Sequence, residues 1–264
     1  AGCIDGYRAT PSGWQAVGRV PLDAIHDRFP SQIRADQFKC IQTESNGVPM
    51  GNPLEFTMMC RDKIESQRRL ETLGVPMPAV CADPSEFSER IRQWNTGFLK
   101  PRFGALGIGV RCVTATDSMP SELPGVVPGR ADPAILQQAI CPPTGWASRT
   151  VRVLLQRTVS GGWFQGTPVV RQSRNNPVAN AAQGAEVVAG HGALPTDCLE
   201  AIHSTVGQIA EAFDRLPEAA LMVEAGVDLV LDSEMKPWLI EVNSRPRGRM
   251  EILASTDPRS YQSA

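Results

Sequence analysis

Two short segments near the C-terminal end of the chain most constrain its fold. The segments "GVDLVLD", residues 226–232, and "PWLIEVN", residues 237–243, each alternate apolar side chains with a period of two, and a polar "SEMK" joins them. Two such runs separated by a short polar loop predict an antiparallel β-hairpin with one apolar face. Asp232 is expected to lie opposite Pro237, across a four-residue loop.

Counting back from this loop brings polar side chains together. The register pairs Asp228 with Glu241 and Gly226 with Asn243, and alternation then puts the two acids and the amide on one face. The opposite face is expected to carry Val227, Leu229, Leu231, Trp238, Ile240 and Val242.

Two carboxylates directly opposite each other repel, so a sheet tolerates them only if a proton or a cation lies between them. A set of two acids and one amide offers only oxygen ligands, which suits Mg²⁺. Asp228, Glu241 and Asn243 are therefore candidate metal ligands. A solvent-facing side of the sheet with incidental polar residues explains the same pattern, and both interpretations stay open at this point.

A second pattern, "FLKPRFGALGIGV", predicts a strand, a glycine loop and another strand. Lys100 ends the first strand, and Gly104, Gly107 and Gly109 follow in the loop. Glycines let a backbone approach an anion closely, and a lysine adds a positive charge for phosphate oxygens. Taken alone, the loop is a weak signal, and an ordinary hairpin loop is the simpler explanation of the glycines. The loop is not a Walker A motif, because it lacks the GK[ST] ending, and it is not a Rossmann fingerprint, because a strand follows it.

The rest of the chain predicts helices, a long hairpin and a poorly structured beginning. Asp62 and Asp83 are suitable N-caps, and the helical segments are 62–74, 83–97 and 196–216. The segment 150–174 predicts a hairpin that turns at Gly161 and Gly162. Residues 1–56 contain clusters of Gly and Pro and only short apolar runs, so they are expected to be loop-rich.

Composition narrows the possible functions. A chain of 264 residues is expected to form one large domain or two to three smaller lobes. The net charge of −2 gives no general attraction to nucleic acid or to an anionic membrane, and no apolar stretch is long enough to span a bilayer. The seven scattered cysteines predict free thiols in a reducing cytoplasm. The chain starts at Ala1 without a methionine, consistent with a truncated first lobe.

Six segments follow one another along the chain: "RDKIESQRRLETLGVPMP", "FLKPRFGALGIGV", "ILQQAICPP", "RTVRVLLQ", "VRQSRNNPVANAAQG" and "GVDLVLDSEMKPWLIEVNSRP". In this order, and with "AIHDRFPSQ" near the start, they resemble the ATP-grasp superfamily over roughly residues 25–250. The resemblance is strongest to its glutathione-synthetase-like and spore-coat-associated members. The resemblance implies an α+β fold in which two subdomains grip ATP between antiparallel sheets, after a partial N-terminal lobe. The implied boundaries are 1–56, 57–136 and 137–264.

The resemblance also implies roles for individual residues. Lys63 and Lys100 would hold the phosphates of ATP, and the loop 103–109 with Gly104 and Gly107 would fold over them. The hinge that reads the adenine edge would be formed by Gln137, Gln138 and Ile140. Two departures from the family pattern are that the phosphate loop has no Ser or Thr and that no acidic residue follows the hinge to hold the ribose.

Further residues would act on the transferred group. Arg152 and Arg171 would lie at the transferred phosphoryl, with Asn180 at the same mouth. Two Mg²⁺ ions would be carried by Asp228, Glu241 and Asn243. The arginines beyond the metal strand, Arg245 and Arg249 above all, are suited to grip a carboxylate through their planar forks, although a solvated basic loop is the alternative.

The function implied by the resemblance is an ATP-dependent carboxylate–amine ligase that forms an amide or peptide bond through an acyl phosphate. Its partners would be a small-molecule or peptide carboxylate and an amine acceptor, with no nucleic acid or membrane. A homodimer is left open. A small-molecule kinase and a non-catalytic ATP-binding structural module are the alternatives.

Overall fold

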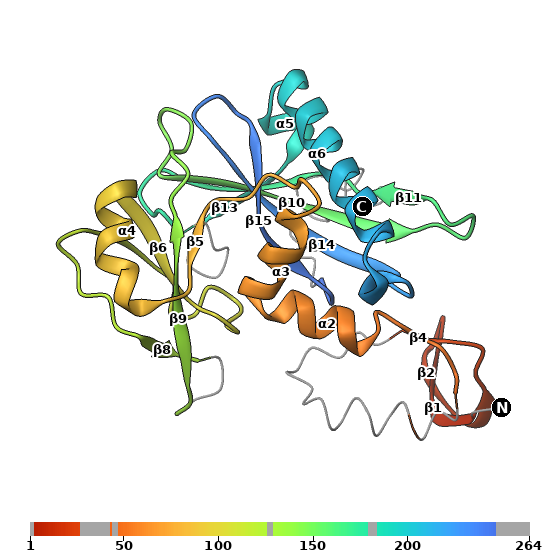
Figure 1. Ribbon diagram of the computed structural model, residues 1–264. Coiled ribbons are helices and arrows are strands. Elements are labelled where there is room, and N and C mark those ends of the chain that lie inside the picture. The colour runs from red at the N-terminus through yellow and green to blue at the C-terminus, as the bar shows by residue number, and fades with distance from the viewer. Residues whose placement is uncertain (1–2, 27–42, 44–46, 126–128, 179–183, 247–264) are drawn as a thin grey trace.

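A computed structural model of the chain describes residues 3–26, 43, 47–125, 129–178 and 184–246. Two larger antiparallel sheets, each covered by helices, are preceded by an N-terminal hairpin (Figure 1). This combination makes the chain an α+β protein, as the sequence predicts. Among the helices in these ranges, none has the length and apolar character needed to cross a bilayer.

The larger sheet has six strands in the order β13-β12-β10-β14-β15, with β11 also paired to β10, and every pairing is antiparallel. The predicted hairpin over 150–174 is confirmed, and its turn contains Gly161, with φ 84°, and Gly162. The six strands are β10 (Ser148–Arg157), β11 (Trp163–Gln165), β12 (Val169–Ser173), β13 (Glu186–Ala189), β14 (Glu224–Leu231) and β15 (Pro237–Asn243).

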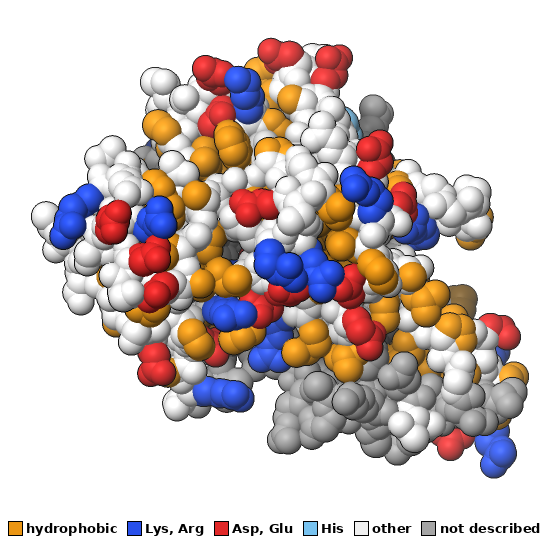
Figure 2. Space-filling model, in the orientation of Figure 1, with side chains coloured by type: hydrophobic (Ala, Val, Ile, Leu, Met, Phe, Trp, Pro, Cys, Tyr) orange, Lys and Arg blue, Asp and Glu red, His pale blue; other side chains and the backbone are white. Residues whose placement is uncertain are grey.

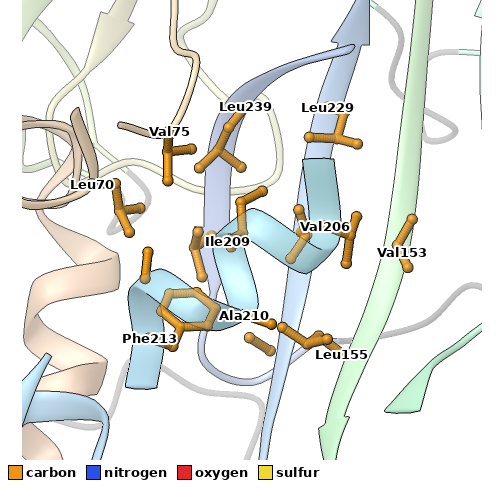
Figure 3. Close-up of a cluster of buried hydrophobic side chains, with 14 of the residues drawn as sticks. Leu70, Val75, Val153, Leu155, Val206, Ile209, Ala210, Phe213, Leu229 and Leu239 are labelled. Atoms are coloured by element: carbon orange, nitrogen blue, oxygen red, sulfur yellow. The ribbon is translucent and has the colours of Figure 1, made fainter. Parts of the chain in front are cut away.

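The helix α6 (Thr196–Asp214) covers one face of this sheet (Figure 3). Its apolar residues recur every three or four positions, so they form one stripe along the helix. Ile202, Val206, Ile209 and Phe213 of this stripe are buried in one core with Val153 and Leu229 and the other inward-facing residues of the strands. The predicted helix over 196–216 is confirmed. Short helical segments flank it at α5 (Gly190–Ala193) and η3 (Pro217–Ala219).

The helices α2 (Leu54–Arg61) and α3 (Lys63–Glu71) belong to the same core. Phe56 of α2 packs edge to face on Phe213 of α6, with ring centroids 5.6 Å apart, and Leu70 of α3 is fully buried beside them. As predicted, the Asp62 side chain caps α3 by accepting from the backbone of Ile64. The core of the larger sheet therefore contains residues on both sides of position 137, while the predicted domain boundaries stay a prediction.

The smaller sheet has five strands in the order β5-β9-β6-β7, with β8 paired to β9. Its core contains Phe87, Ile91, Leu99 and Leu136, and α4 (Phe87–Trp94) covers it after the short η1 (Pro84–Glu86) that Asp83 caps. The strands are β5 (Val80–Cys81), β6 (Thr96–Pro101), β7 (Arg111–Thr114), β8 (Glu122–Pro124) and β9 (Ala131–Gln138).

The hairpin of β14 and β15 has the predicted register at one end only. Asp228 lies opposite Glu241 and Gly226 opposite Asn243, as predicted, but Leu231 rather than Asp232 lies opposite Pro237. The register shifts by one residue between Asp228 and Leu229, which marks a β-bulge. The predicted pairing at the turn is therefore wrong.

The bulge also changes which side chains enter the core. Leu239 is fully buried, whereas Trp238 and Ile240, which strict alternation would send inward, are only partly buried. Trp238 instead donates its indole N–H to the carboxylate of Asp232 at 3.0 Å. The extra residue in β15 breaks the period of two, so both expectations for an inward position, at Trp238 and Ile240, are wrong.

The described part of residues 1–56 contains more regular structure than the predicted loop-rich segment. β1 (Cys3–Thr10) and β2 (Gly13–Pro21) form an antiparallel hairpin that lies beside the rest of the molecule in Figure 1. The turn is closed by Gly13, with φ 127°, whose carbonyl accepts from the Thr10 hydroxyl. The prediction failed because the strands are rich in Gly and Ala and present most of their side chains to solvent, so no apolar period marks them.

A buried amide links the N-terminal lobe to the larger sheet. Asn52 follows β4 (Met50–Gly51), which pairs in parallel with β3 (Ile25–His26). Its side chain donates to the carbonyl oxygens of Glu224 and Ser244, and its Oδ1 accepts from the Val223 amide at 2.8 Å. Next to it, Nε2 of His26 lies 3.3 Å from the buried carboxylate of Glu224. The start of β14 and the residue that follows β15 are therefore fixed to the N-terminal lobe.

The bulge can be tested by paired truncations. Leu239→Ala is expected to lower the free energy of unfolding by about 2–5 kcal/mol, because it removes fully buried methyl groups. Ile240→Ala is expected to cost about 1 kcal/mol or less, because its side chain is only partly buried. Urea unfolding of both variants measures the difference, and the reverse order would show that the unbulged register is correct.

Candidate active site

A row of charged side chains crosses the face of the larger sheet that α6 leaves uncovered. Arg152 on β10 lies opposite Asp228 on β14, and Asp228 lies opposite Glu241 on β15. The neighbours of Arg152, Val151 and Val153, are buried in the core, so alternation along β10 points Arg152 to the other face. The hydrophobic pattern of each strand therefore sets the position of the row.

The strongest contact in this row joins Arg152 to Asp228. Nε of Arg152 donates to Oδ1 of Asp228 at 2.7 Å, and Nη2 donates to Oδ2. The two side chains are only 17% and 11% exposed. Burial alone lowers the pKa of Arg152, but the charge and hydrogen bonds of Asp228 outweigh it, so this pKa lies above its ordinary value.

Other side chains complete the surroundings of the two acids. Asn243 donates from Nδ2 to Oδ2 of Asp228 at 3.0 Å, and Nη1 of Arg171, from β12, lies 3.9 Å from Oδ1 of the same carboxylate. Nζ of Lys63 lies 3.9 Å from Oε1 of Glu241. The cation that the opposed carboxylates require is thus present within the chain, as a guanidinium and an ammonium group.

The glycine loop connects β6 to β7 and lies against the start of α3. Nζ of Lys63 donates to the carbonyl oxygen of Gly104 at 2.5 Å. Arg102 binds both carboxylate oxygens of Asp62, at 2.8 and 2.7 Å, while Asp62 also caps α3. Sequence reasoning missed the contact between Arg102 and Asp62, because nothing in either segment indicates a partner 40 residues away.

The glycines of this loop have steric reasons of their own. A Cβ on Gly104 would lie 2.8 Å from Cβ of Pro101, and a Cβ on Gly109 would lie 2.9 Å from its Cγ. Gly107 and Gly109 have φ of 71° and 72°, which side chains rarely allow. The ordinary-loop interpretation therefore explains the glycines without a ligand, and phosphate binding by this loop stays a prediction.

Lys100, at the end of β6, links the smaller sheet to this charged row. Its ammonium donates to Oε1 of Gln137, on β9, at 2.5 Å. Burial lowers the pKa of Lys100 to about 8, although the nearby charge of Glu241 opposes the shift. The charges of Lys63 and Asp228 also act on it, so the two sheets bring their polar side chains together. We refer to Lys63, Lys100, Arg152, Asp228 and Glu241 as the inter-sheet site.

The remaining predicted residues are placed less closely. The predicted hinge begins inside β9, which ends at Gln138. The backbone N–H of Gln138 donates to the backbone carbonyl of Ala79. Ile140 lies two residues beyond this strand, and Arg245 lies partly buried two residues beyond β15. Two predicted residues lie outside the described ranges, Asn180 and Arg249.

The surface around α3 carries both signs of charge. Figure 2 shows Lys and Arg side chains beside Asp and Glu side chains over this helix. Glu65 accepts hydrogen bonds from Arg68 and Arg69, which lowers the pKa of its carboxyl to about 2. The carboxylate of Glu65 therefore offsets part of the positive charge of Arg68 and Arg69 on this face.

The arrangement defines a class of protein. Two α+β units with antiparallel sheets and a charged site where they meet are typical of ATP-grasp proteins. Residues 62–264 match the model of a family described as YheC/D like ATP-grasp. The chain therefore belongs to the YheC/D-like ATP-grasp family, and the predicted ATP-grasp fold is confirmed.

Solved structures show the same fold at low sequence identity. D-alanyl-alanine synthetase A from Vibrio cholerae has a TM-score of 0.61 and 16% identity, over 91% of this chain and 78% of that one. Carboxyaminoimidazole ribonucleotide synthase from Aspergillus clavatus, in complex with ATP, has a TM-score of 0.61 and 13% identity, over 87% of this chain and 56% of that one. The D-alanine–D-alanine ligase from Coxiella burnetii has a TM-score of 0.56 and 13% identity, over 92% of this chain and 65% of that one. A search of curated proteins finds no match.

The environment of Lys100 predicts a dependence of stability on pH. The pKa of Lys100 in the folded protein, about 8, lies below its ordinary value of 10.5. The buried charge therefore lowers the free energy of unfolding by its full amount below pH 8, and this loss disappears as the pH approaches 10.5. We expect Lys100→Met to raise the free energy of unfolding by about 1–3 kcal/mol at pH 7. The difference from the parent protein should shrink between pH 8 and 10.

Urea unfolding across this pH range checks the prediction. Lys236→Met is the matched control, because Lys236 is 67% exposed and pairs with Glu234 in the β14–β15 turn. The control should gain no stability. A Lys100→Met protein that is less stable than the parent at every pH would contradict the assigned shift.

Proposed function

We propose that this chain is an ATP-dependent carboxylate–amine ligase that forms an amide or peptide bond through an acyl phosphate. The observation that carries the proposal is the inter-sheet site, where two opposed carboxylates and basic side chains from both sheets meet. Attack of a carboxylate on the γ-phosphate brings two anions together, so positive charge must surround them. The ligases among the structural neighbours support the same chemistry.

The candidate metal ligands fit a hard cation such as Mg²⁺. Asp228, Glu241 and Asn243 project from one end of the hairpin, and the amide of Asn243 donates from nitrogen to Asp228, so its oxygen remains an acceptor. Oxygen ligands of this kind are those that Mg²⁺ prefers. In the described ranges no group of three or more His, Cys, Asp or Glu side chains is placed to hold a metal. The proposed set of two acids and one amide would hold up to two ions, which supply positive charge to the phosphates.

The basic residues of the site would bind and orient the phosphates. Lys63, from the start of α3, and Lys100, from the smaller sheet, would hold them, with Gln137 fixing the ammonium of Lys100. The loop 103–109 would cover them and exclude water. Arg152 and Arg171 share the open face of the larger sheet, where they would stabilise the negative charge on the transferred phosphoryl.

The proposed reaction has two balanced steps. An oxygen of the substrate carboxylate bonds to the γ-phosphorus, and the bond from that phosphorus to ADP breaks. The amine nitrogen then bonds to the acyl carbon, phosphate leaves with its electron pair, and the amine loses a proton. Arg245 and Arg249 would grip a carboxylate of the substrate through their planar forks, with Asn180 at the mouth of the site.

The reaction can be tested with ATP, Mg²⁺ and a panel of amino acids and short peptides. We expect release of ADP that depends on the carboxylate, and formation of a hydroxamate when hydroxylamine replaces the amine. A stable phosphorylated product instead would show a kinase. Binding of ATP without any turnover across the panel would favour a structural module.

A single variant tests the role of the opposed acids. Glu241→Gln keeps the shape of the side chain but removes its charge, so we expect ADP release to fall on the order of 100-fold or more. Glu234→Gln is the matched control, since Glu234 is 69% exposed in the turn of the same hairpin, and its turnover should be unchanged. Full turnover by the Glu241 variant would falsify the metal assignment.

A further inference from the structure

Asp228, the central candidate metal ligand, already has partners on both oxygens. Arg152 donates to Oδ1 and to Oδ2, and Asn243 donates to Oδ2 as well. A divalent cation that approaches this carboxylate must therefore compete with a charged, bidentate hydrogen-bond partner. Arg–carboxylate pairs of this geometry are among the strongest side-chain contacts, so the displacement needs a compensating interaction.

The charge around the site points in the same direction. The carboxylates of Asp228 and Glu241 have three cations nearby. A nitrogen of Arg152, of Arg171 and of Lys63 each lies no more than 3.9 Å from one of their oxygens. Lys100 adds a further positive charge that acts on both acids. A free divalent cation would enter a region in which positive side chains outnumber negative ones, which disfavours its binding.

The phosphate-directed lysines show the same pattern as Arg152. Lys63 donates to the carbonyl of Gly104, and Lys100 donates to the amide oxygen of Gln137. Each of these three cations is thus satisfied by an acceptor from the chain itself. A triphosphate brings several negative charges and many acceptor oxygens, so it can replace these internal acceptors.

We propose that Arg152 is an internal counter-ion that occupies Asp228 until nucleotide phosphates draw it away, so that divalent metal enters only with the nucleotide or after it. This inference rests on the proposed nucleotide site. Without nucleotide, Arg152 blocks the metal ligand. With nucleotide bound, the guanidinium turns to the phosphates, so that Oδ1 of Asp228 becomes available to a cation and Oδ2 keeps only the neutral donor Asn243. Arg152 therefore makes the binding of metal at Asp228 depend on the binding of nucleotide.

The test measures binding of Mn²⁺, an oxygen-seeking substitute for Mg²⁺ that is visible by electron paramagnetic resonance, to the full chain without nucleotide. The parent protein is expected to bind Mn²⁺ weakly. Arg152→Gln should bind it at least about 10-fold more tightly, because one charge and one bidentate partner are removed together. Adding ADP to the parent protein should increase its Mn²⁺ affinity beyond that of ADP alone.

Two variants with the same change of charge act as controls. Arg157 lies on the same strand about 16 Å further along, where it binds Asp214 of α6, so Arg157→Gln should leave Mn²⁺ binding unchanged. Arg171 lies 3.9 Å from Asp228 without the bidentate contact, so Arg171→Gln should gain less than Arg152→Gln. Equal gains from Arg171→Gln and Arg152→Gln would overturn occupation by Arg152 and leave only a general effect of charge.

Further outcomes separate this inference from the proposed function. Binding of a fluorescent nucleotide in the presence of excess Mg²⁺ tests the nucleotide site by itself, and its failure would overturn both. Nucleotide binding together with tight Mn²⁺ binding by the nucleotide-free parent protein would overturn the counter-ion role alone. If Arg152→Gln does not fold, Arg152→Lys keeps the charge but not the fork and should give a smaller gain in Mn²⁺ affinity. No gain in a folded Arg152→Lys protein would count against the inference.

Discussion

Burial of one face of the six-stranded sheet beneath α6 is the constraint on which the rest of the site depends. Because Val227 and Leu229 are fixed in the core, Asp228 between them must lie on the opposite face. The same reasoning applies to Arg152 between Val151 and Val153. A slip of one residue would drive a carboxylate into the core, where an unpaired charge is very costly. The packing of apolar side chains therefore enforces the alignment of the charged row.

Where local pattern decides the structure, the sequence was sufficient. The alternation of "GVDLVLD" and "PWLIEVN" predicted the hairpin and the pairing of Asp228 with Glu241, and the stripe of α6 predicted its buried face. The bulge was missed because Trp238, Leu239 and Ile240 form a continuous apolar run, which gives no signal for the residue that faces inward. The N-terminal hairpin was missed because its mostly exposed strands lack an apolar period.

Contacts between distant segments were beyond sequence reasoning. Lys63 and Arg152 were named from a resemblance and Lys100 also from the glycine-loop pattern, but nothing in the sequence indicated that each would have an internal acceptor. The opposed acids were expected to need a proton or a cation, and the pattern suggested a metal. In the structure a guanidinium donates to Asp228 and an ammonium lies 3.9 Å from Glu241. A counter-ion of this kind depends on the pairing of β10 with β14, which joins segments 76 residues apart.

The first residues of α3 connect the two sheets, and this connection limits how the site can change shape. Asp62 caps the helix and binds Arg102 at the start of the glycine loop, while Lys63 reaches both the loop and Glu241. The helix itself is fixed in the larger core through Leu70. A movement of the smaller sheet as a rigid body would therefore stretch a bidentate ion pair at its edge. Closure over a ligand is easier if the loop beyond Arg102 moves and this pair remains in place as the pivot.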